Sequence, residues 1–352
     1  MDCVTRVHDL GGPADGPPVL LLHANGFHSH VFEPMLPVLT DFFRVRAIDL
    51  PGHGDAWRSG PSGADVGCTI DLLSAWIDAA DLRGRCLCLG HSLGGALALA
   101  AEGARPGLFA AVFAYEPVAA PAAAAAARVP ARAAACAALA AMATRRRADF
   151  GSRDEAAARL GGKPPFSAFD PAALRAYISR GLRPGSAADG GASSSGVGAA
   201  GWTLKCSPQT EAAWFMAVGE CVGVAAERVR CPVVIAVGRS GGGGGGNGSR
   251  SGGAVEGGGG GSGAGGGKGG GGGGVVHSHL PLLGEQLAEA LPHVLLRRYG
   301  HLTHFGPLEA PREVAGDARL FFEGVLDARR GAGGDAAPPP PPGAPPAARP
   351  KL

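Results

Sequence analysis

The sequence has little net charge, no long apolar run and no closely paired cysteines. Over 352 residues the formal net charge is only +2, which gives no electrostatic basis for binding nucleic acid or an anionic membrane. No uninterrupted apolar run reaches the roughly 18 residues that a membrane span needs. The beginning, "MDCVTRVHDL", is charged and lacks the apolar stretch of a signal peptide. We therefore expect an intracellular protein without a transmembrane segment or a nucleic-acid partner.

The eight cysteines are scattered, and none stands in a Cys-x-x-Cys pair. This distribution is typical of reduced thiols in an intracellular protein and gives no support to a metal site. The glycine tract at 241–274 invites comparison with a phosphate-binding loop, but it lacks the Gly-Lys-Ser/Thr end that such a loop needs. We expect neither a metal nor a cofactor.

Glycine, with 61 residues, and proline, with 29, are in excess and are concentrated in a few stretches. Much of the glycine lies in the 241–274 tract, and proline is frequent in "PPGAPPAARP" near the end. Neither stretch can bury enough apolar surface to offset the entropy of ordering it. We predict a disordered insert at 240–274 and a disordered tail at 331–352.

Elsewhere, short apolar runs that end in turn residues alternate with helical patterns. The runs predict strands within 17–27, 42–55, 85–92, 108–117, 231–238 and 293–300, and the helical patterns lie at 70–82, 93–104 and 311–330. Such alternation predicts parallel strands with right-handed crossovers.

Residues 118–228 break this alternation with alanine-rich helical patterns at 128–150 and 170–182. We therefore predict an α/β fold, with a mostly parallel sheet flanked by helices. Its core comprises residues 1–117 and 229–330, and a helical lid is inserted at 118–228.

One stretch, "CLGHSLGGA" at 88–96, joins a predicted strand to a predicted helix through a serine between glycines. So sharp a turn forces Ser92 into a strained backbone conformation that leaves room only for glycine at Gly90 and Gly94. The Ser92 hydroxyl then stands at the first turn of a helix. There the amide of Leu93 can stabilise negative charge on an attacked carbonyl.

A serine hydroxyl becomes a strong nucleophile when a histidine takes its proton. His23 and His53 follow strands, and we expect them to orient loops. The stretch "YGHLTHFGPLEAP" at 299–311 follows the last predicted strand, so that His301 and His304 lie where reactive groups gather in open α/β folds.

Four motifs occur in one order: "HANGF", "DLPGHGD", "GHSLGG" and "THFGPLEAP". Together they resemble the α/β-hydrolase superfamily, specifically its lidded esterase- and lipase-like serine hydrolases. The resemblance implies that Ser92 is the nucleophile and His304 the base, with His301 as the alternative. It also implies that Asn25 offers a second oxyanion amide beside that of Leu93.

The third member of the triad is harder to place. Most of these hydrolases carry the acid just after the strand that corresponds to 231–238, where this chain continues "GRSGGGGGG" and has no carboxylate before Glu256. A minority carry it one strand earlier, where "FAYEPV" offers Glu116. We take Glu116 as the acid; Glu256, or no acid at all, is the alternative.

The expected function is hydrolysis of a carboxylic ester of a small or lipid-like substrate through an acyl-enzyme. A carbon–carbon bond hydrolase of the same fold and a non-catalytic ligand-binding protein are the alternatives. The last residues, Pro350, Lys351 and Leu352, match two of three positions of a Ser-Lys-Leu peroxisomal address. We therefore expect a cytoplasmic or peroxisomal protein, with an import receptor as partner if the address works.

Overall fold

The computed structural model describes residues 3–127, 130–185, 201–219, 222–239 and 280–331. The glycine-rich insert predicted at 240–274, with the alternative acid Glu256, lies outside the described residues. So do 332–352 of the predicted tail, including the tripeptide Pro350, Lys351 and Leu352.

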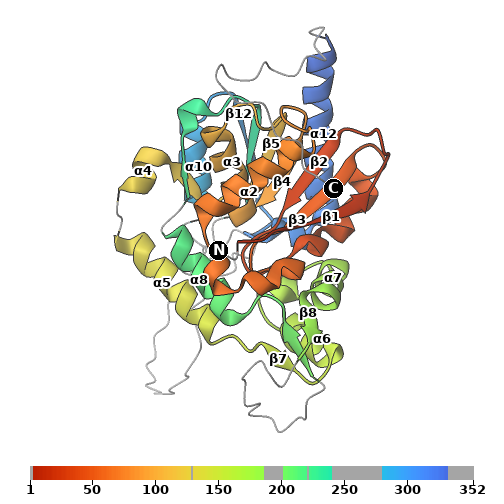
Figure 1. Ribbon diagram of the computed structural model, residues 1–352, viewed down its shortest axis with the longest axis vertical. Coiled ribbons are helices and arrows are strands. Elements are labelled where there is room, and N and C mark those ends of the chain that lie inside the picture. Colours follow the sequence, from red (N-terminus) through yellow and green to blue (C-terminus); the bar gives the residue numbers. More distant parts are fainter. Residues whose placement is uncertain (1–2, 128–129, 186–200, 220–221, 240–279, 332–352) are drawn as a thin grey trace, which may run out of the picture.

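A seven-stranded sheet forms the centre of the fold (Figure 1). Its strands, in spatial order, are β1 (Arg6–Gly11), β3 (Arg44–Asp49), β2 (Pro18–Leu22), β4 (Leu87–His91), β5 (Ala111–Tyr115), β11 (Val233–Val237) and β12 (Val294–Arg298). Only β1 runs antiparallel to its neighbour, and the other six strands are mutually parallel. The mostly parallel sheet predicted from the sequence is confirmed.

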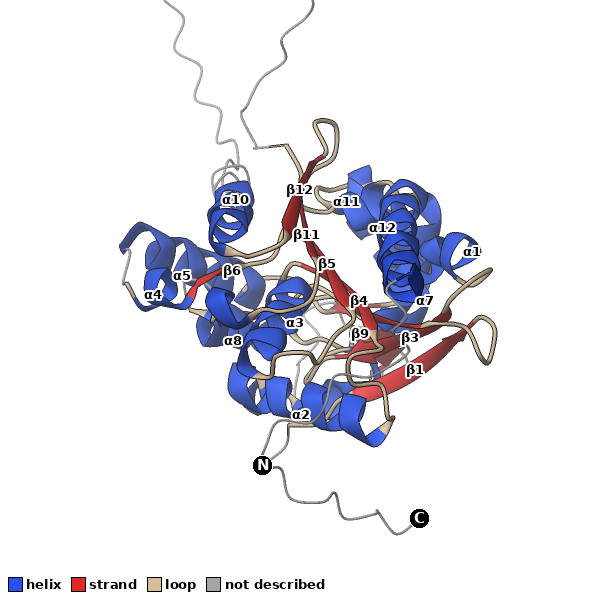
Figure 2. Ribbon diagram, turned by 90° about the horizontal axis from the view of Figure 1, so that it is seen from above, coloured by secondary structure: helices blue, strands red, loops and turns tan. Residues whose placement is uncertain are grey.

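Helices cover both faces of this sheet (Figure 2). One face carries α2 (Val66–Ala79), α3 (Leu93–Ala104) and α10 (Leu280–Ala290); the other carries α1 (Leu36–Leu39) and α12 (Pro311–Gly331). Along β2, Val19 and Leu21 pack into one apolar cluster, while Leu20 and Leu22 pack into the other. Because both faces are covered, the strand reads as a continuous apolar run.

The chain leaves the sheet between two neighbouring strands, β5 and β11, and we call residues 118–228 the insertion. Its elements are β6 (Ala119–Pro121), α4 (Ala122–Ala126), α5 (Pro130–Thr144), β7 (Asp149–Phe150), α6 (Arg153–Gly161), α7 (Pro171–Gly181), β8 (Leu182–Pro184), β9 (Trp202–Leu204), α8 (Pro208–Val218) and β10 (Val222–Val224). Helices α5 to α8 lie below the sheet in Figure 1.

Three parts of this architecture differ from the sequence prediction. Strand β1 was not predicted, because the exposed side chains of this edge strand leave no apolar pattern. Helix α10 was also missed. The insertion, predicted as helical, contains a three-stranded antiparallel sheet of β7, β9 and β8, whose strands of two or three residues are too short to give a periodic signal.

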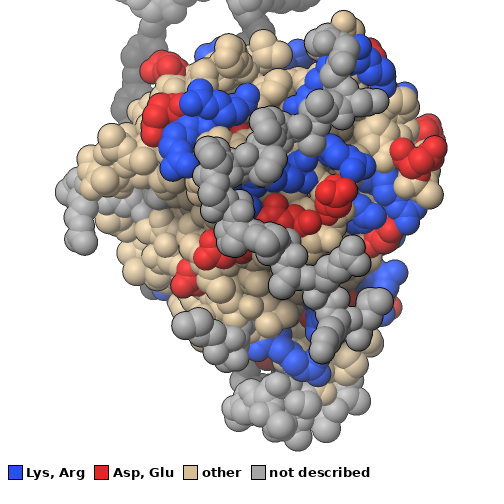
Figure 3. All heavy atoms as spheres, turned by 45° about the horizontal axis from the view of Figure 1, so that its top comes forward, with Lys and Arg blue, Asp and Glu red and all other residues tan. Residues whose placement is uncertain are grey.

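The surface is mixed in charge. On the face drawn in Figure 3, basic and acidic side chains are interspersed over the upper part, and a wide area at the lower left shows neither. Among the described residues, no helix combines the length and apolarity needed to cross a membrane.

Candidate active site

Ser92 lies at the turn between β4 and α3, in a backbone conformation that is rare for a residue with a side chain. Its φ is +54° and its ψ is −112°. The neighbouring glycines explain how the turn closes. A Cβ at Gly90 would come within 2.6 Å of the Gly95 backbone, and one at Gly94 within 2.3 Å of the Leu22 carbonyl oxygen. Side chains are therefore excluded at both positions, as the sequence predicted.

His304 meets Ser92 from the loop that follows β12. Its Nε2 lies 3.0 Å from Ser92 Oγ. The loop is braced by His91, whose Nε2–H donates to the His304 carbonyl oxygen at 2.7 Å, and by the Tyr115 hydroxyl, which donates to the Thr303 carbonyl at 2.9 Å. Burial lowers the pKa of His304 to about 4, so its imidazole is neutral at pH 7 and can accept a proton.

Glu116 approaches the other side of the imidazole. It follows β5, has a positive φ of +47° and is fully buried. Its Oε2 lies 3.5 Å from His304 Nδ1, and its Oε1 accepts a hydrogen bond from the Gly238 amide at 2.6 Å. Because β5 and β11 are neighbours, a carboxylate after β5 reaches the end of β11, where most of the resembling hydrolases carry the acid.

The alternative histidine lies elsewhere. The side chain of His301 is largely exposed, and its Nε2 lies 3.0 Å from a carboxylate oxygen of Glu313 on α12. The structure thus brings together Ser92, His304 and Glu116, and leaves His301 on the surface.

The two predicted oxyanion residues lie at the same edge of the sheet. Leu93 is the first residue of α3, where a backbone amide has no carbonyl partner within the helix. Asn25 lies in the loop after β2, the strand next to β4. Its side-chain Nδ2 donates to the Glu211 carbonyl oxygen on α8, at 3.0 Å, so the insertion touches this loop.

Two buried histidines fix the Asn25 loop from the core side. The Gly26 amide donates to His53 Nε2 at 3.0 Å, and the Leu50 amide donates to His23 Nε2, also at 3.0 Å. In each ring Nε2 accepts a hydrogen bond and therefore carries no proton, so both imidazoles are neutral. Burial, followed by the nearby His23, lowers the pKa of His53 to about 3, which agrees with this state.

An aromatic cluster adjoins His304. Phe305, the next residue, lies near Phe27 of the Asn25 loop and near Phe169 of the insertion, with ring centroids 6.0 and 5.7 Å away. Phe166 and Tyr177 of the insertion complete the cluster. The insertion therefore contributes aromatic side chains to the cluster that packs against Phe305, the residue next to His304.

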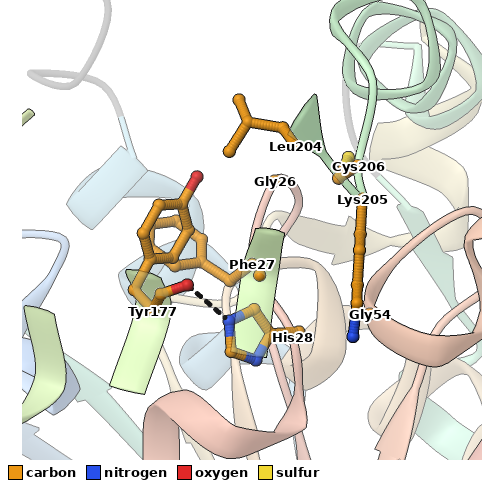
Figure 4. Close-up of a pocket in the computed structure, with 9 residues that line it drawn as sticks. Gly26, Phe27, His28, Gly54, Tyr177, Leu204, Lys205 and Cys206 are labelled. Carbon is orange, nitrogen blue, oxygen red and sulfur yellow. Dashed lines mark hydrogen bonds between the residues drawn. The ribbon is translucent and has the colours of Figure 1, made fainter. Parts of the chain in front are cut away.

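A small pocket lies between the Asn25 loop and the insertion (Figure 4). Gly26, Phe27 and His28 line one side, and Tyr177 and the segment 204–206 line the other. The His28 Nε2–H donates to the Tyr177 carbonyl oxygen at 3.2 Å, as the dashed line in Figure 4 shows. Neither Ser92 nor His304 lines this pocket. Both side chains are nearly covered, with 6% and 8% of their surface exposed.

One group among the described residues has the composition of a metal site: His8, Asp49 and Asp55. The Asp49 carboxylate already accepts hydrogen bonds from the Ser29 and Asp55 amides and contacts His8. The Lys205 ammonium lies 2.5 Å from an Asp55 oxygen and supplies the positive charge there. This group is therefore an ion-pair network whose carboxylate oxygens already have partners, which does not fit a metal site.

Comparisons with known proteins agree with the fold and the motifs. A family model described as the alpha/beta hydrolase fold matches residues 17–146. The chain resembles, at 21% identity and a TM-score of 0.60, the crystal structure of E-2-(acetamidomethylene)succinate hydrolase, over 91% of this chain and 99% of that one. It also resembles the peroxisomal α/β-hydrolase Lpx1 of Saccharomyces cerevisiae, at 16% identity and a TM-score of 0.61, over 99% and 85% of the two chains. These likenesses show the α/β-hydrolase fold.

Similarity to curated proteins is closer but more local. The chain is 43% identical, over 82 residues, to the pimeloyl-[acyl-carrier protein] methyl ester esterase of Neisseria meningitidis serogroup A. The match covers 23% of this chain and 24% of the esterase. The chain thus spans about a quarter of the length of this relative.

Proposed function

We propose that this protein is a serine hydrolase that cleaves a carboxylic ester through an acyl-enzyme, without metal or cofactor. Ser92 attacks the ester carbonyl, His304 takes the serine proton and returns it to the leaving alcohol, and Glu116 orients the imidazole and stabilises its charged form. The observation that carries the proposal is the 3.0 Å contact between Ser92 Oγ and His304 Nε2, across 212 residues of sequence. The local sequence similarity to the N. meningitidis protein, which is named a methyl ester esterase, supports the same chemistry.

The tetrahedral intermediate needs donors for its negative oxygen. We assign the amides of Leu93 and Asn25 to this role, because both follow parallel neighbouring strands and therefore lie at the edge that carries Ser92. Loss of one such donor typically costs about 3 kcal/mol of transition-state stabilisation.

The substrate is a small or lipid-like ester whose acyl part packs on the aromatic cluster of Phe27, Phe166, Phe169, Tyr177 and Phe305. In this proposal, residues 1–117 and 229–330 form the catalytic core and the insertion at 118–228 serves as a lid. The aromatic side chains of the lid exclude water from the reactive carbonyl, which strengthens the electrostatic interactions around it.

Labelling with a fluorophosphonate probe, together with hydrolysis of p-nitrophenyl acetate, tests the proposal. Wild type should label and turn over, whereas Ser92→Ala and His304→Ala should lose both. His301→Ala is the matched control and should behave as wild type. Equal labelling of wild type and Ser92→Ala would show that Ser92 is not the nucleophile. Turnover of a ring-cleavage dienoate without esterase activity would replace the proposal with carbon–carbon hydrolysis, and ligand binding without any turnover would make the protein a receptor.

A further inference from the structure

The loop that carries Asn25 is held from the insertion as well as from the core. On the core side it is fixed by the hydrogen bond from the Gly26 amide to His53. On the other side, the Asn25 amide side chain donates to the backbone carbonyl of Glu211, in the first turn of α8. The position of α8 therefore sets the position of the loop that would stabilise the oxyanion.

This contact brings a carboxylate close to the loop. A Cβ built on Gly26 would lie 3.0 Å from Glu211 Oε1 and 3.2 Å from its carboxyl carbon. Only 15% of the Glu211 side chain is exposed, so water screens its charge weakly. A lone carboxylate beside an oxyanion loop opposes the negative charge that must build up during ester cleavage.

Arg146, in the turn after α5, compensates this charge. Its Nη2 lies 2.7 Å from Glu211 Oε2, and the guanidinium also donates to the Tyr177 hydroxyl and to the Cys206 carbonyl, each at 3.3 Å. Burial acts to lower the pKa of Arg146, but Glu211, together with Tyr177 and Cys206, holds the pKa above its ordinary value. Tyr177 and Cys206 also line the pocket beside the Asn25 loop (Figure 4). Arg146 is therefore hydrogen-bonded to two residues of that lining.

We propose that Arg146 is a positioning residue for the reaction, which acts through Glu211. It neutralises the Glu211 carboxylate at the Asn25 loop, so that α8 can hold this loop without adding negative charge to the oxyanion site. The inference rests on the proposed function, since it concerns the transition state of ester cleavage.

The neighbouring Arg147 provides a matched control. It also pairs with a glutamate, with its Nη2 2.7 Å from Glu155 Oε1, but this pair is exposed and lies away from the Asn25 loop. The two arginines thus share residue type, sequence environment and pair geometry, and differ in burial and in the presence of the loop.

Steady-state hydrolysis of the neutral ester p-nitrophenyl acetate measures the effect without an arginine–substrate ion pair. Arg146→Met should lower kcat roughly 10- to 100-fold with KM nearly unchanged, because the unpaired Glu211 charge opposes the transition state. Glu211→Gln should keep kcat within about threefold of wild type, and Arg146→Met combined with Glu211→Gln should return it to that range. Arg147→Met should match wild type.

The signs of these effects separate charge compensation from a purely structural role. A structural ion pair predicts equal losses for Arg146→Met and Glu211→Gln, in step with their thermal midpoints, and this result would overturn the inference. So would a wild-type kcat in Arg146→Met, or a double variant as slow as Arg146→Met. If Arg146→Met does not fold, the double variant decides, since it leaves neither charge buried alone. Should wild type hydrolyse no ester at all, the proposed function fails first.

Discussion

The carboxyl edge of the sheet and the insertion hold the site by different means. At the sheet edge, backbone conformation fixes the reactive groups. Ser92 and Glu116 both have positive φ, and Gly94 packs so closely against the Leu22 carbonyl that no side chain fits there. In the insertion, side-chain contacts fix the structure next to the site, namely the Arg146–Glu211 ion pair and the aromatic contacts. A backbone held by steric exclusion has no nearby alternative, whereas side chains can repack. We therefore expect substitutions at the edge to abolish structure or activity, and those in the insertion to tune activity.

The largest effect should come from Gly94→Ala. The new Cβ would meet the Leu22 carbonyl oxygen at 2.3 Å and its carbon at 2.5 Å, and β2 is a central strand that cannot move away. We expect the free energy of unfolding to fall by roughly 3 kcal/mol or more, measured by urea denaturation. Gly324→Ala in α12 is the control: nothing lies within 4 Å of its Cβ, and it should stabilise by about 0.5–1 kcal/mol. Equal stability of the two variants would refute the steric argument.

Glu116→Gln should leave the fold intact and impair turnover. The carboxamide oxygen can still accept from the Gly238 amide, but the group no longer stabilises a positive imidazole. We expect kcat on p-nitrophenyl acetate to fall roughly 10²- to 10⁴-fold. Glu313→Gln, which alters the exposed partner of His301, should have no effect. If Glu116→Gln keeps wild-type kcat, the acid lies elsewhere, and Glu256→Gln is the next variant to measure.

The pH dependence of activity tests whether the His304 imidazole stays buried from solvent during turnover. Burial lowers the pKa of His304 to about 4, and the ring must be neutral to take the serine proton. Activity should therefore be present above about pH 5 and decline as the pH falls through about 4. The measurement is kcat/KM against pH at constant ionic strength, with circular dichroism to verify folding. A decline near pH 6.5, the ordinary value for histidine, would show that the Glu116 carboxylate or solvent offsets the effect of burial in the working state.

The same contrast explains what the sequence could predict. The motif around Ser92 was recognisable because steric exclusion at Gly90 and Gly94 leaves a fixed pattern of residues. Glu116 was implied by the resemblance, since a minority of those hydrolases carry the acid after the corresponding strand, and the structure places it 3.5 Å from His304. Arg146 and Glu211 left no comparable signal, since they are 65 residues apart and meet only through the packing of α5 and α8. Nothing in the local sequence distinguishes Arg146 from Arg147.

The smallest effect should come from Phe169→Leu, in the aromatic cluster of the insertion. Its ring lies 5.2 Å from that of Phe166 and 5.7 Å from that of Phe305, and a leucine can fill most of this volume. We expect a loss of stability below about 1.5 kcal/mol. We also expect KM for p-nitrophenyl octanoate to change a few-fold, with kcat on the acetate ester preserved.

Phe321→Leu separates packing from substrate contact. This ring packs on Phe113 and Phe322, beside the sheet and away from the insertion, so it should cost similar stability without altering KM for either ester. Parallel KM changes in the two variants would mean that the Phe169 effect reflects stability alone. A selective change in Phe169→Leu would instead show that side chains of the insertion set the acyl preference, while the backbone of the sheet edge sets the chemistry.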